Sequence, residues 1–142
     1  ESYFTALSSV KEFMDGTIAQ AKADGYVTTY LGRRRPMPDL HSPDRGVAAY
    51  AERAAANTPL QGSAADIVKV AMVQLAKRMA AQYPEAGLLL QVHDELVVET
   101  PAAQAAGVAG LLREVMETVA TLRVPLTVDI AVGQNWRDVE GM

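Results

Sequence analysis

A polar tripeptide, His93-Asp94-Glu95, stands between two short apolar segments, residues 88–92 and 96–99. Hairpin turns usually contain Gly, Asn or Asp-Gly, because the turn needs positive φ angles or local side-chain hydrogen bonds. Here two acids occupy the turn and no glycine is present. Carboxylates are the oxygen ligands that Mg²⁺ prefers, and a pair of such ions can stabilise the attacking and leaving oxygens of a phosphoryl displacement. The tripeptide therefore predicts part of a divalent-metal site.

A solvated polar turn is the alternative interpretation of this tripeptide, since short motifs often match by chance. A zinc site is disfavoured, because the chain contains no cysteine and its two histidines, His41 and His93, are far apart in sequence.

A run of three arginines, Arg33-Arg34-Arg35, follows Gly32. Guanidinium groups bind phosphate through paired hydrogen bonds, so the run predicts phosphate contacts. Pairing with acids, or packing against the domain, is the alternative role, and we expect a mixture of the two.

A second polar set, Arg53, Asn57 and Gln61, is spaced by four and would share one face of a continuous helix. Pro59 predicts a bend between Asn57 and Gln61 instead. A second helix would then begin with Thr58 as its N-cap and Pro59 at its first position, with Gln61 at the capping-box site. Capping alone would account for Gln61, and a surface ion pair would account for Arg53.

Composition is that of an ordinary globular chain. The 142 residues are 49% hydrophobic and 21% charged, which fits one continuous module with a buried core. The longest apolar runs fall far short of the ~20 residues that span a bilayer, so no membrane partner is expected. The net charge of −4 argues mildly against stand-alone nucleic-acid binding, although a local basic patch remains at residues 33–35, with Arg45 and Arg53 beyond it. The chain starts without Met and within an apparent helix, so we expect the tail of a longer protein.

Periodicity predicts the elements that position these residues. Helices are expected over residues 3–23, 44–56, 58–82 and 108–119, with Gly25 as the stop of the first. Strands are expected over residues 26–30, 88–92, 96–99 and 126–132, with an irregular segment at 36–43 and a polar tail from 133. Tyr3, Phe4, Phe13 and Trp136 are interpreted as core or packing residues, as are Met72, Met79 and Met116. The sum predicts an α+β fold, with a small antiparallel sheet packed by helices on one face.

Several motifs recur in the order and spacing of one protein family. They are Gly25-Tyr26-Val27-Thr28-Thr29, Gly32-Arg33-Arg34-Arg35, Pro38-Asp39, Ala51-Glu52-Arg53, Asn57-Thr58-Pro59-Leu60-Gln61-Gly62-Ser63-Ala64-Ala65-Asp66, Leu90-Gln91-Val92-His93-Asp94-Glu95-Leu96, Val124-Pro125-Leu126 and Gly133-Gln134-Asn135-Trp136. Over nearly its whole length the chain resembles the C-terminal part of the polymerase domain in the bacterial DNA polymerase I family, family A.

The resemblance implies roles for individual residues. Asp94 matches the family's catalytic metal-binding aspartate in the palm, Glu95 the more peripheral acid beside it, and His93 a histidine near the primer terminus. The remaining matches imply DNA binding: Arg53, Asn57 and Gln61 touch the minor-groove side of the primer–template end, and Arg33, Arg34 and Arg35 lie near the fingers and template side. Minor-groove acceptors are similar for every base pair, so such contacts report pair geometry rather than sequence.

The resemblance also implies the architecture and partners of a complete enzyme. Residues 1–86 would form the fingers side with connecting helices, and residues 87–142 the palm sheet and helix of a right-hand polymerase. The implied partners are primer–template DNA, a dNTP and the upstream part of the polymerase, and the implied cofactor is a pair of Mg²⁺ ions in the complete enzyme. The implied location is the bacterial cytoplasm, in association with the nucleoid.

Departures from the family limit what this chain is expected to do alone. Relatives carry a second palm aspartate and a nucleotide-binding fingers helix upstream of the matched region, and Asp15 and Asp24 lack that aspartate's surroundings. Ala48 stands where an arginine is common, which predicts weaker phosphate contact. We therefore expect an incomplete, inactive enzyme segment. The alternatives are a module that binds duplex ends or a partner subunit without chemistry, and a remnant that associates through exposed apolar faces.

Overall fold

The structure is a computed structural model that describes residues 7–141. Tyr3 and Phe4, which the sequence places in the first helix, lie outside the described residues. The chain divides into two compact units, one ending at Asp66 and the other beginning at Ile67. Mixed helices and small antiparallel sheets confirm the predicted α+β class.

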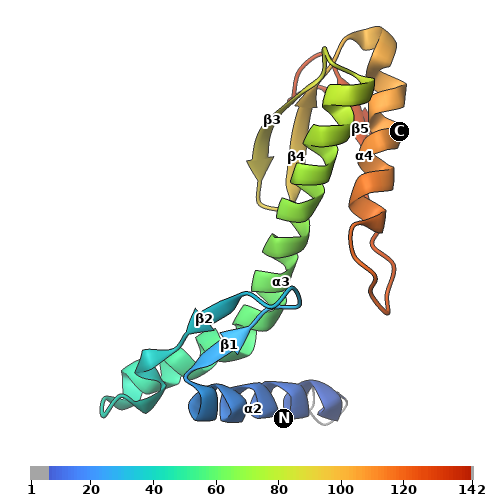
Figure 1. The fold of residues 1–142 in the computed structure, drawn as a ribbon. Helices are drawn as coiled ribbons and strands as arrows, with labels where there is room; N and C mark the ends of the chain where they lie inside the picture. The colour runs from blue at the N-terminus through green and yellow to red at the C-terminus, as the bar shows by residue number, and fades with distance from the viewer. Residues whose placement is uncertain (1–6, 142) are drawn as a thin grey trace. The chain divides into compact units, whose positions relative to one another are not determined.

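Helix α2 (Ser8–Asp24) is the first element among the described residues and ends as the sequence predicts (Figure 1). Gly25 adopts the left-handed conformation at φ 79°, and its N–H donates to the carbonyl oxygen of Ala21 at 2.8 Å. This termination suits glycine, because a side chain at positive φ crowds the backbone. Strand β1 (Tyr26–Thr28) follows directly.

Two residues of the arginine run, Arg34 and Arg35, lie in a strand that the sequence does not predict, and Arg33 precedes it. Strand β2 (Arg34–Pro36) pairs antiparallel with β1, with Tyr26 opposite Pro36 and Thr28 opposite Arg34. Only the segment between the strands turns, with Gly32 at φ 83°. Pro36 ends the pair, and the predicted irregular segment contains a short 3₁₀ helix, η1 (Pro38–His41). Pairing with β1 thus makes a strand of residues 34–36, which have no strand signal of their own in the sequence.

Helix α3 (Arg45–Gln82) replaces the two helices that the sequence predicts. Pro59 lies inside this helix, so Thr58 is no N-cap and Gln61 is in no capping box. The hydroxyl of Thr58 instead donates to the carbonyl oxygen of Ala54, one turn back along the same helix, at 2.7 Å. A mid-helix proline costs about 3 kcal/mol, so packing on either side of Pro59 must outweigh that penalty.

The core of the first unit lies where α2, β1, η1 and α3 meet. It is built from small and medium side chains, namely Ala21, Val27, Met37, Leu40, Ala51 and Ala55. Ala55 is completely buried, and Ala56 and Thr58 beside it are nearly so. This packing holds the α3 turn just before Pro59.

The second unit places a hairpin on two helices. Strands β3 (Gly87–Val92) and β4 (Glu95–Glu99) pair antiparallel, and a 3₁₀ turn, η2 (Ala102–Gln104), leads into α4 (Ala105–Thr118). The strands lie beside α3 and α4 in Figure 1. The core between them contains Ala71, Leu75 and Met79 from α3 and Leu111 and Val115 from α4, with Met116 packed at its edge. Met79 and Met116 thus have the predicted core role, whereas Met72 is half-buried.

The end of the chain differs from the sequence prediction. The strand expected over 126–132 is reduced to β5 (Ala131–Gly133), which pairs with a strand that the sequence did not predict, β6 (Val139–Gly141). Before β5 the backbone finds no ladder among residues 7–141, and the N–H of Val128 bonds the side chain of Glu117 at 3.0 Å. The strands therefore form three separate pairs rather than one small sheet.

Two of the aromatic residues predicted to be core are exposed. Phe13 is 46% exposed on α2, and Trp136 is 54% exposed in the turn between β5 and β6. No described residue covers either side chain. The prediction that they are core residues rested on their hydrophobic character alone and was wrong. No helix within residues 7–141 has the length and apolar character needed to cross a membrane.

Leu75→Ala tests the core of the second unit. Leu75 is 0% exposed, so the truncation should lower the free energy of unfolding by about 3 kcal/mol through reduced burial and a residual cavity. Leu89→Ala is the matched control, because Leu89 is 54% exposed and its truncation should change stability by less than about 0.5 kcal/mol. Urea unfolding measures both, and equal losses of stability would contradict the assigned core.

Candidate functional site

The β3–β4 hairpin carries the predicted metal ligands at its tip. Val92 pairs with Glu95, so His93 and Asp94 alone form the turn and Glu95 opens β4. His93 is at φ 56°, the one described non-glycine residue with a positive φ. The side-chain amide of Gln91 donates to the carbonyl oxygen of His93 at 3.0 Å and holds the turn. The two acids are thus adjacent, Asp94 on the turn and Glu95 at the first position of β4.

The left-handed conformation of His93 is a local strain. A residue with a Cβ pays about 1–2 kcal/mol there, which Gly or Asn would largely avoid. Strained backbone of this kind collects at functional sites, where the surrounding structure enforces it. Here the paired strands on both sides hold the turn in this conformation, since their pairing extends from Val92–Glu95 to Gly87–Glu99.

The flanks of the hairpin are partly buried on one face only, although both segments are apolar. Leu88, Leu96 and Val98 pack on the core of the second unit. Leu89 and Leu90, by contrast, are 54% and 51% exposed. The register of the pair shifts between Leu88 and Leu90, so strict alternation fails at this point. His93, Asp94 and Glu95 are all exposed.

The donor chemistry of the tip fits Mg²⁺, but the set is partial. Asp94 and Glu95 contribute carboxylate oxygens, the ligand type that Mg²⁺ takes while keeping several waters. Across residues 7–141, no three His, Cys, Asp or Glu side chains gather closely enough to hold a metal ion. Asp94 and Glu95 are therefore a pair of candidate ligands with no third one beside them among the described residues.

The predicted DNA-contacting trio lies on α3 in the first unit. Arg53, Asn57 and Gln61 are all exposed, and because α3 continues through Pro59 their spacing puts them on one helix face. No capping role remains to account for Gln61. Arg53 makes no ion pair among the described residues, and its guanidinium carbon lies 5.9 Å from the centre of the exposed Tyr50 ring.

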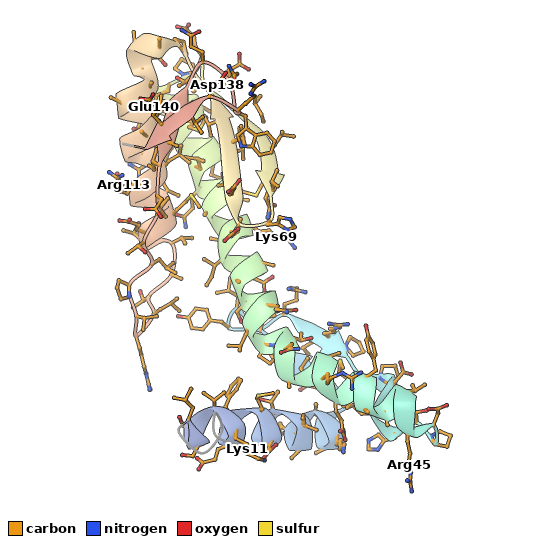
Figure 2. The ribbon with its side chains drawn as sticks, turned by 180° about the vertical axis from the view of Figure 1, so that it is seen from behind. Lys11, Arg45, Lys69, Arg113, Asp138 and Glu140 are labelled. Carbon is orange, nitrogen blue, oxygen red and sulfur yellow. The ribbon has the colours of Figure 1, made fainter. Side chains whose placement is uncertain are left out.

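Arg33 and the two arginines of β2 each make an intramolecular contact, which is the pairing and packing part of the predicted mixture; their contact with phosphate stays a prediction. Arg33 Nε donates to a carboxylate oxygen of Asp66 at 2.7 Å. Arg34 lies over the ring of Tyr26 at 4.6 Å, and Arg35 donates to the hydroxyl of Thr58 at 2.8 Å. All three remain exposed, as does Arg45 at the start of α3 (Figure 2).

Asp66 is the polar residue that sequence reasoning missed. It stands in the recognised segment after Gln61, yet the sequence offers no reason to give it a role. Its carboxylate binds both Thr29 and Arg33, which lie more than thirty residues earlier in the chain. The one feature that could have drawn attention to Asp66 is that it is the only acid in the segment Gly62-Ser63-Ala64-Ala65-Asp66.

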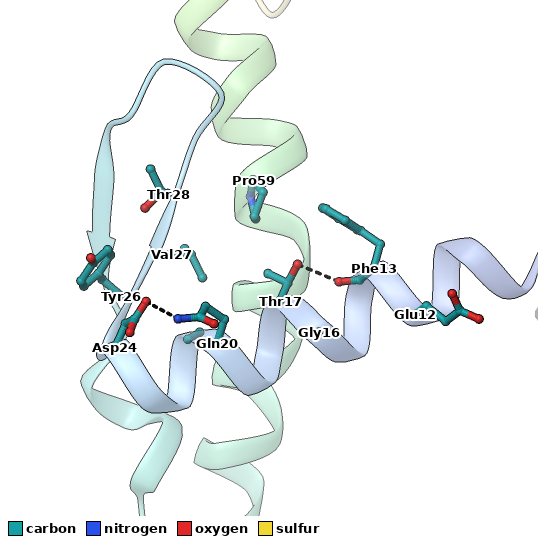
Figure 3. Close-up of a pocket in the computed structure, with 11 residues that line it drawn as sticks. Glu12, Phe13, Gly16, Thr17, Gln20, Asp24, Tyr26, Val27, Thr28 and Pro59 are labelled. Carbon is teal, nitrogen blue, oxygen red and sulfur yellow. Dashed lines mark hydrogen bonds between the residues drawn. The ribbon is translucent and has the colours of Figure 1, made fainter. Parts of the chain in front are cut away.

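A shallow groove of the first unit contains none of the predicted site residues. It has a volume of about 440 Å³ and lies between α2, β1 and Pro59 (Figure 3). Its lining includes the apolar Phe13 and Val27 and the acids Glu12 and Asp24. These acids repel phosphate groups, so this groove does not suit a nucleic-acid backbone.

A bidentate ion pair joins the helices beneath the hairpin. Arg78 Nη1 and Nη2 on α3 donate to the two carboxylate oxygens of Glu114 on α4 at 2.8 and 3.0 Å. These hydrogen bonds, reinforced by the charge attraction, lower the pKa of Glu114 below its ordinary value of 4.5 and raise the pKa of Arg78. This exposed pair links α3 to α4 and contains none of the predicted site residues.

Comparison with known proteins identifies the class to which this fold and site belong. The family model for DNA polymerase family A matches residues 1–138, and the chain belongs to this family, as its motifs predict. It is 49% identical to DNA polymerase I of Geobacillus stearothermophilus over 140 residues, which is 99% of this chain and 16% of that protein. It is 47% identical to the thermostable DNA polymerase I of Thermus thermophilus over 136 residues, again 16% of the relative.

A solved structure matches the fold as well as the sequence. The POL domain of Pol1 from M. smegmatis, in complex with DNA primer-template and dNTP, superposes with a TM-score of 0.85 at 44% identity. The match covers 89% of this chain and 22% of that one. The chain thus spans about one-sixth of the length of the curated relatives that it matches.

Substitutions at His93 test the strained turn. Asn tolerates the left-handed conformation, whereas a β-branched side chain opposes it. His93→Asn should therefore be at least as stable as the parent, and His93→Val should lose roughly 1–2 kcal/mol of unfolding free energy. Thermal and urea unfolding provide the comparison. If the Asn and Val variants were equally stable, the turn would not have the left-handed backbone described.

Proposed function

We propose that this chain is a segment of a DNA-directed DNA polymerase that extends a primer by template-directed nucleotidyl transfer. The supporting observation is the exposed Asp94–Glu95 pair at the strained tip of the hairpin, in a chain matched by the family A model over residues 1–138. The proposed substrates are primer–template DNA and a dNTP, the molecules named with the M. smegmatis structure.

The hairpin would provide the chemical side of the site. Asp94, with Glu95 beside it, would hold Mg²⁺, which when bound supplies positive charge to the attacking and leaving oxygens. The hairpin itself contributes position, because packing of Leu88, Leu96 and Val98 fixes the strands that carry the tip. His93 would lie near the primer terminus. Positioning and charge stabilisation account for most catalysis in phosphoryl transfer, so rigidity at the tip serves the reaction directly.

The first unit would provide the contacts to DNA. Arg53, Asn57 and Gln61 present donors from one exposed face of α3, which suits the acceptors of the minor groove. Arg34 and Arg35 are exposed on β2 and suit phosphate oxygens. In this scheme residues 1–86 belong to the fingers side and its connecting helices, and residues 87–142 to the palm.

Asp94→Ala tests the chemical role of the hairpin. In the full-length protein the substitution should reduce primer extension by at least about a thousandfold, because it removes a metal ligand, while the affinity for primer–template changes little. Gel-based extension and fluorescence anisotropy measure the two quantities.

Glu99→Ala is the matched control, since Glu99 is an exposed acid on the same strand, at the other end of the hairpin. It should extend primers at the parental rate. Full extension by Asp94→Ala would overturn the proposed function.

The isolated 142-residue chain tests whether this segment is sufficient. Two carboxylates at the tip and no three-ligand cluster within residues 7–141 make an incomplete metal site, so the chain alone should extend no primer above background. Adding the upstream part of the polymerase in trans should restore measurable extension. Extension by the isolated chain would contradict the proposed incompleteness, and tight binding to duplex ends without any restored activity would favour a binding module.

A further inference from the structure

The turn between β1 and β2 is fixed to α3 by one buried carboxylate. Asp66 is 8% exposed, and its two oxygens accept hydrogen bonds from opposite sides of the turn. The hydroxyl of Thr29 donates to one oxygen at 2.7 Å, and Arg33 Nε donates to the other at 2.7 Å. Thr29 Oγ1 also accepts from the N–H of Arg33 at 3.1 Å, which closes the network.

The backbone makes a second set of contacts at the same place. The N–H of Tyr30 donates to the hydroxyl of Ser63 at 2.8 Å, and Arg33 Nη2 donates to the carbonyl oxygen of Gly62 at 3.2 Å. A Cβ at Gly62 would lie only 2.8 Å from the methyl group of Thr29. Residues 62, 63 and 66 thus form a docking surface for the turn on one side of α3, immediately after Gln61.

Because of this network, the three neighbouring arginines differ in how many donors they keep for a ligand. Arg33 is committed to Asp66, whose negative charge competes with any phosphate for the same guanidinium. Arg35 makes one described hydrogen bond, to Thr58, and Arg34 stacks on Tyr26, so both keep donors that a ligand can use. The position of β2, and with it Arg34 and Arg35, depends on where the turn is held.

We propose that Asp66 is a positioning residue for DNA: through Thr29 and Arg33 it holds the β1–β2 turn on α3, so that the arginines of β2 and Gln61 meet the nucleic acid together. The inference rests on the proposed polymerase function and extends it to residues outside the DNA-contacting set. The proposed positioning role predicts a change in DNA affinity opposite in sign to the change expected from charge alone. Removing a negative charge from a DNA-binding face should tighten binding by Coulomb attraction alone, whereas removal of this carboxylate should weaken it.

The test uses Asp66→Asn in the full-length protein, with Asp15→Asn as the matched control. Asp15 is an exposed aspartate on α2, paired with Lys11, so its replacement makes the same change in charge without touching the turn. The dissociation constant for primer–template is measured over a range of salt concentrations, together with kcat and KM for extension. Thermal unfolding confirms that each variant is folded.

Asp66→Asn should raise the dissociation constant about tenfold and raise KM for primer–template while kcat stays within about twofold. The slope of log affinity against log salt should fall by about one for each phosphate that an arginine of β2 no longer neutralises. Asp15→Asn should bind as the parent does or slightly more tightly. Unchanged or tighter binding by Asp66→Asn, or a reduction confined to kcat, would overturn the positioning role.

A second pair of variants keeps the proposal testable if Asp66→Asn does not fold. Thr29→Ser keeps the hydroxyl that binds Asp66 and should retain parental affinity, whereas Thr29→Val keeps the shape, lacks the hydroxyl and should bind several-fold more weakly. Equal affinities for the two would refute the proposal. Failure here remains distinct from failure of the polymerase function, because only full extension by Asp94→Ala bears on the latter.

Discussion

Pro59 has no backbone N–H to donate one turn back along α3, and its ring crowds the carbonyl there, yet the helix continues through it. The first unit compensates on both sides of the proline. Before it, Ala51 and Ala55 are buried in the core against α2 and β1, and Thr58 bonds back to Ala54. After it, the β1–β2 turn is fixed to Gly62, Ser63 and Asp66. Continuity of α3 at this point decides which side chains can act together, since Arg53, Asn57 and Gln61 share a face only if the helix does not break.

The same helix separates two kinds of surface in the first unit. One surface presents the exposed donors of Arg53, Asn57 and Gln61. The other, at residues 62, 63 and 66, is covered by the β1–β2 turn. Gly62 and Asp66 belong to the second surface. Gly62 allows the side chain of Thr29 to approach the helix closely, and the carboxylate of Asp66 binds both Thr29 and Arg33. Asp66 offsets the charge of Arg33, while Arg34 and Arg35 on β2 keep exposed guanidinium groups in an acidic chain.

Local signals predicted the elements well where the physics is local. Gly25 ends α2 because its lack of a Cβ permits the left-handed cap, and the spacing of Leu111 and Val115 placed α4. The β3–β4 hairpin was predicted from two apolar segments around a polar tip, and the acids lie at its end. Prediction failed where a distant partner decides the outcome. Strand β2 needs β1, β6 needs β5, and residues 126–130 lack a ladder among the described residues. The break at Pro59 was a sound local inference that tertiary packing reversed.

The sequence by itself determined the family, the acid pair at positions 94 and 95, and the four-residue spacing of the trio on α3. These are matters of residue type and order, which the chain displays without folding. Only the tertiary structure decided that His93 carries the left-handed backbone of the turn, that Leu89 and Leu90 are exposed, and that Asp66 meets Thr29 and Arg33. The physical reason is range. A cap or an apolar period acts within a few residues, whereas a buried carboxylate is satisfied by whatever groups the fold brings to it from elsewhere in the chain.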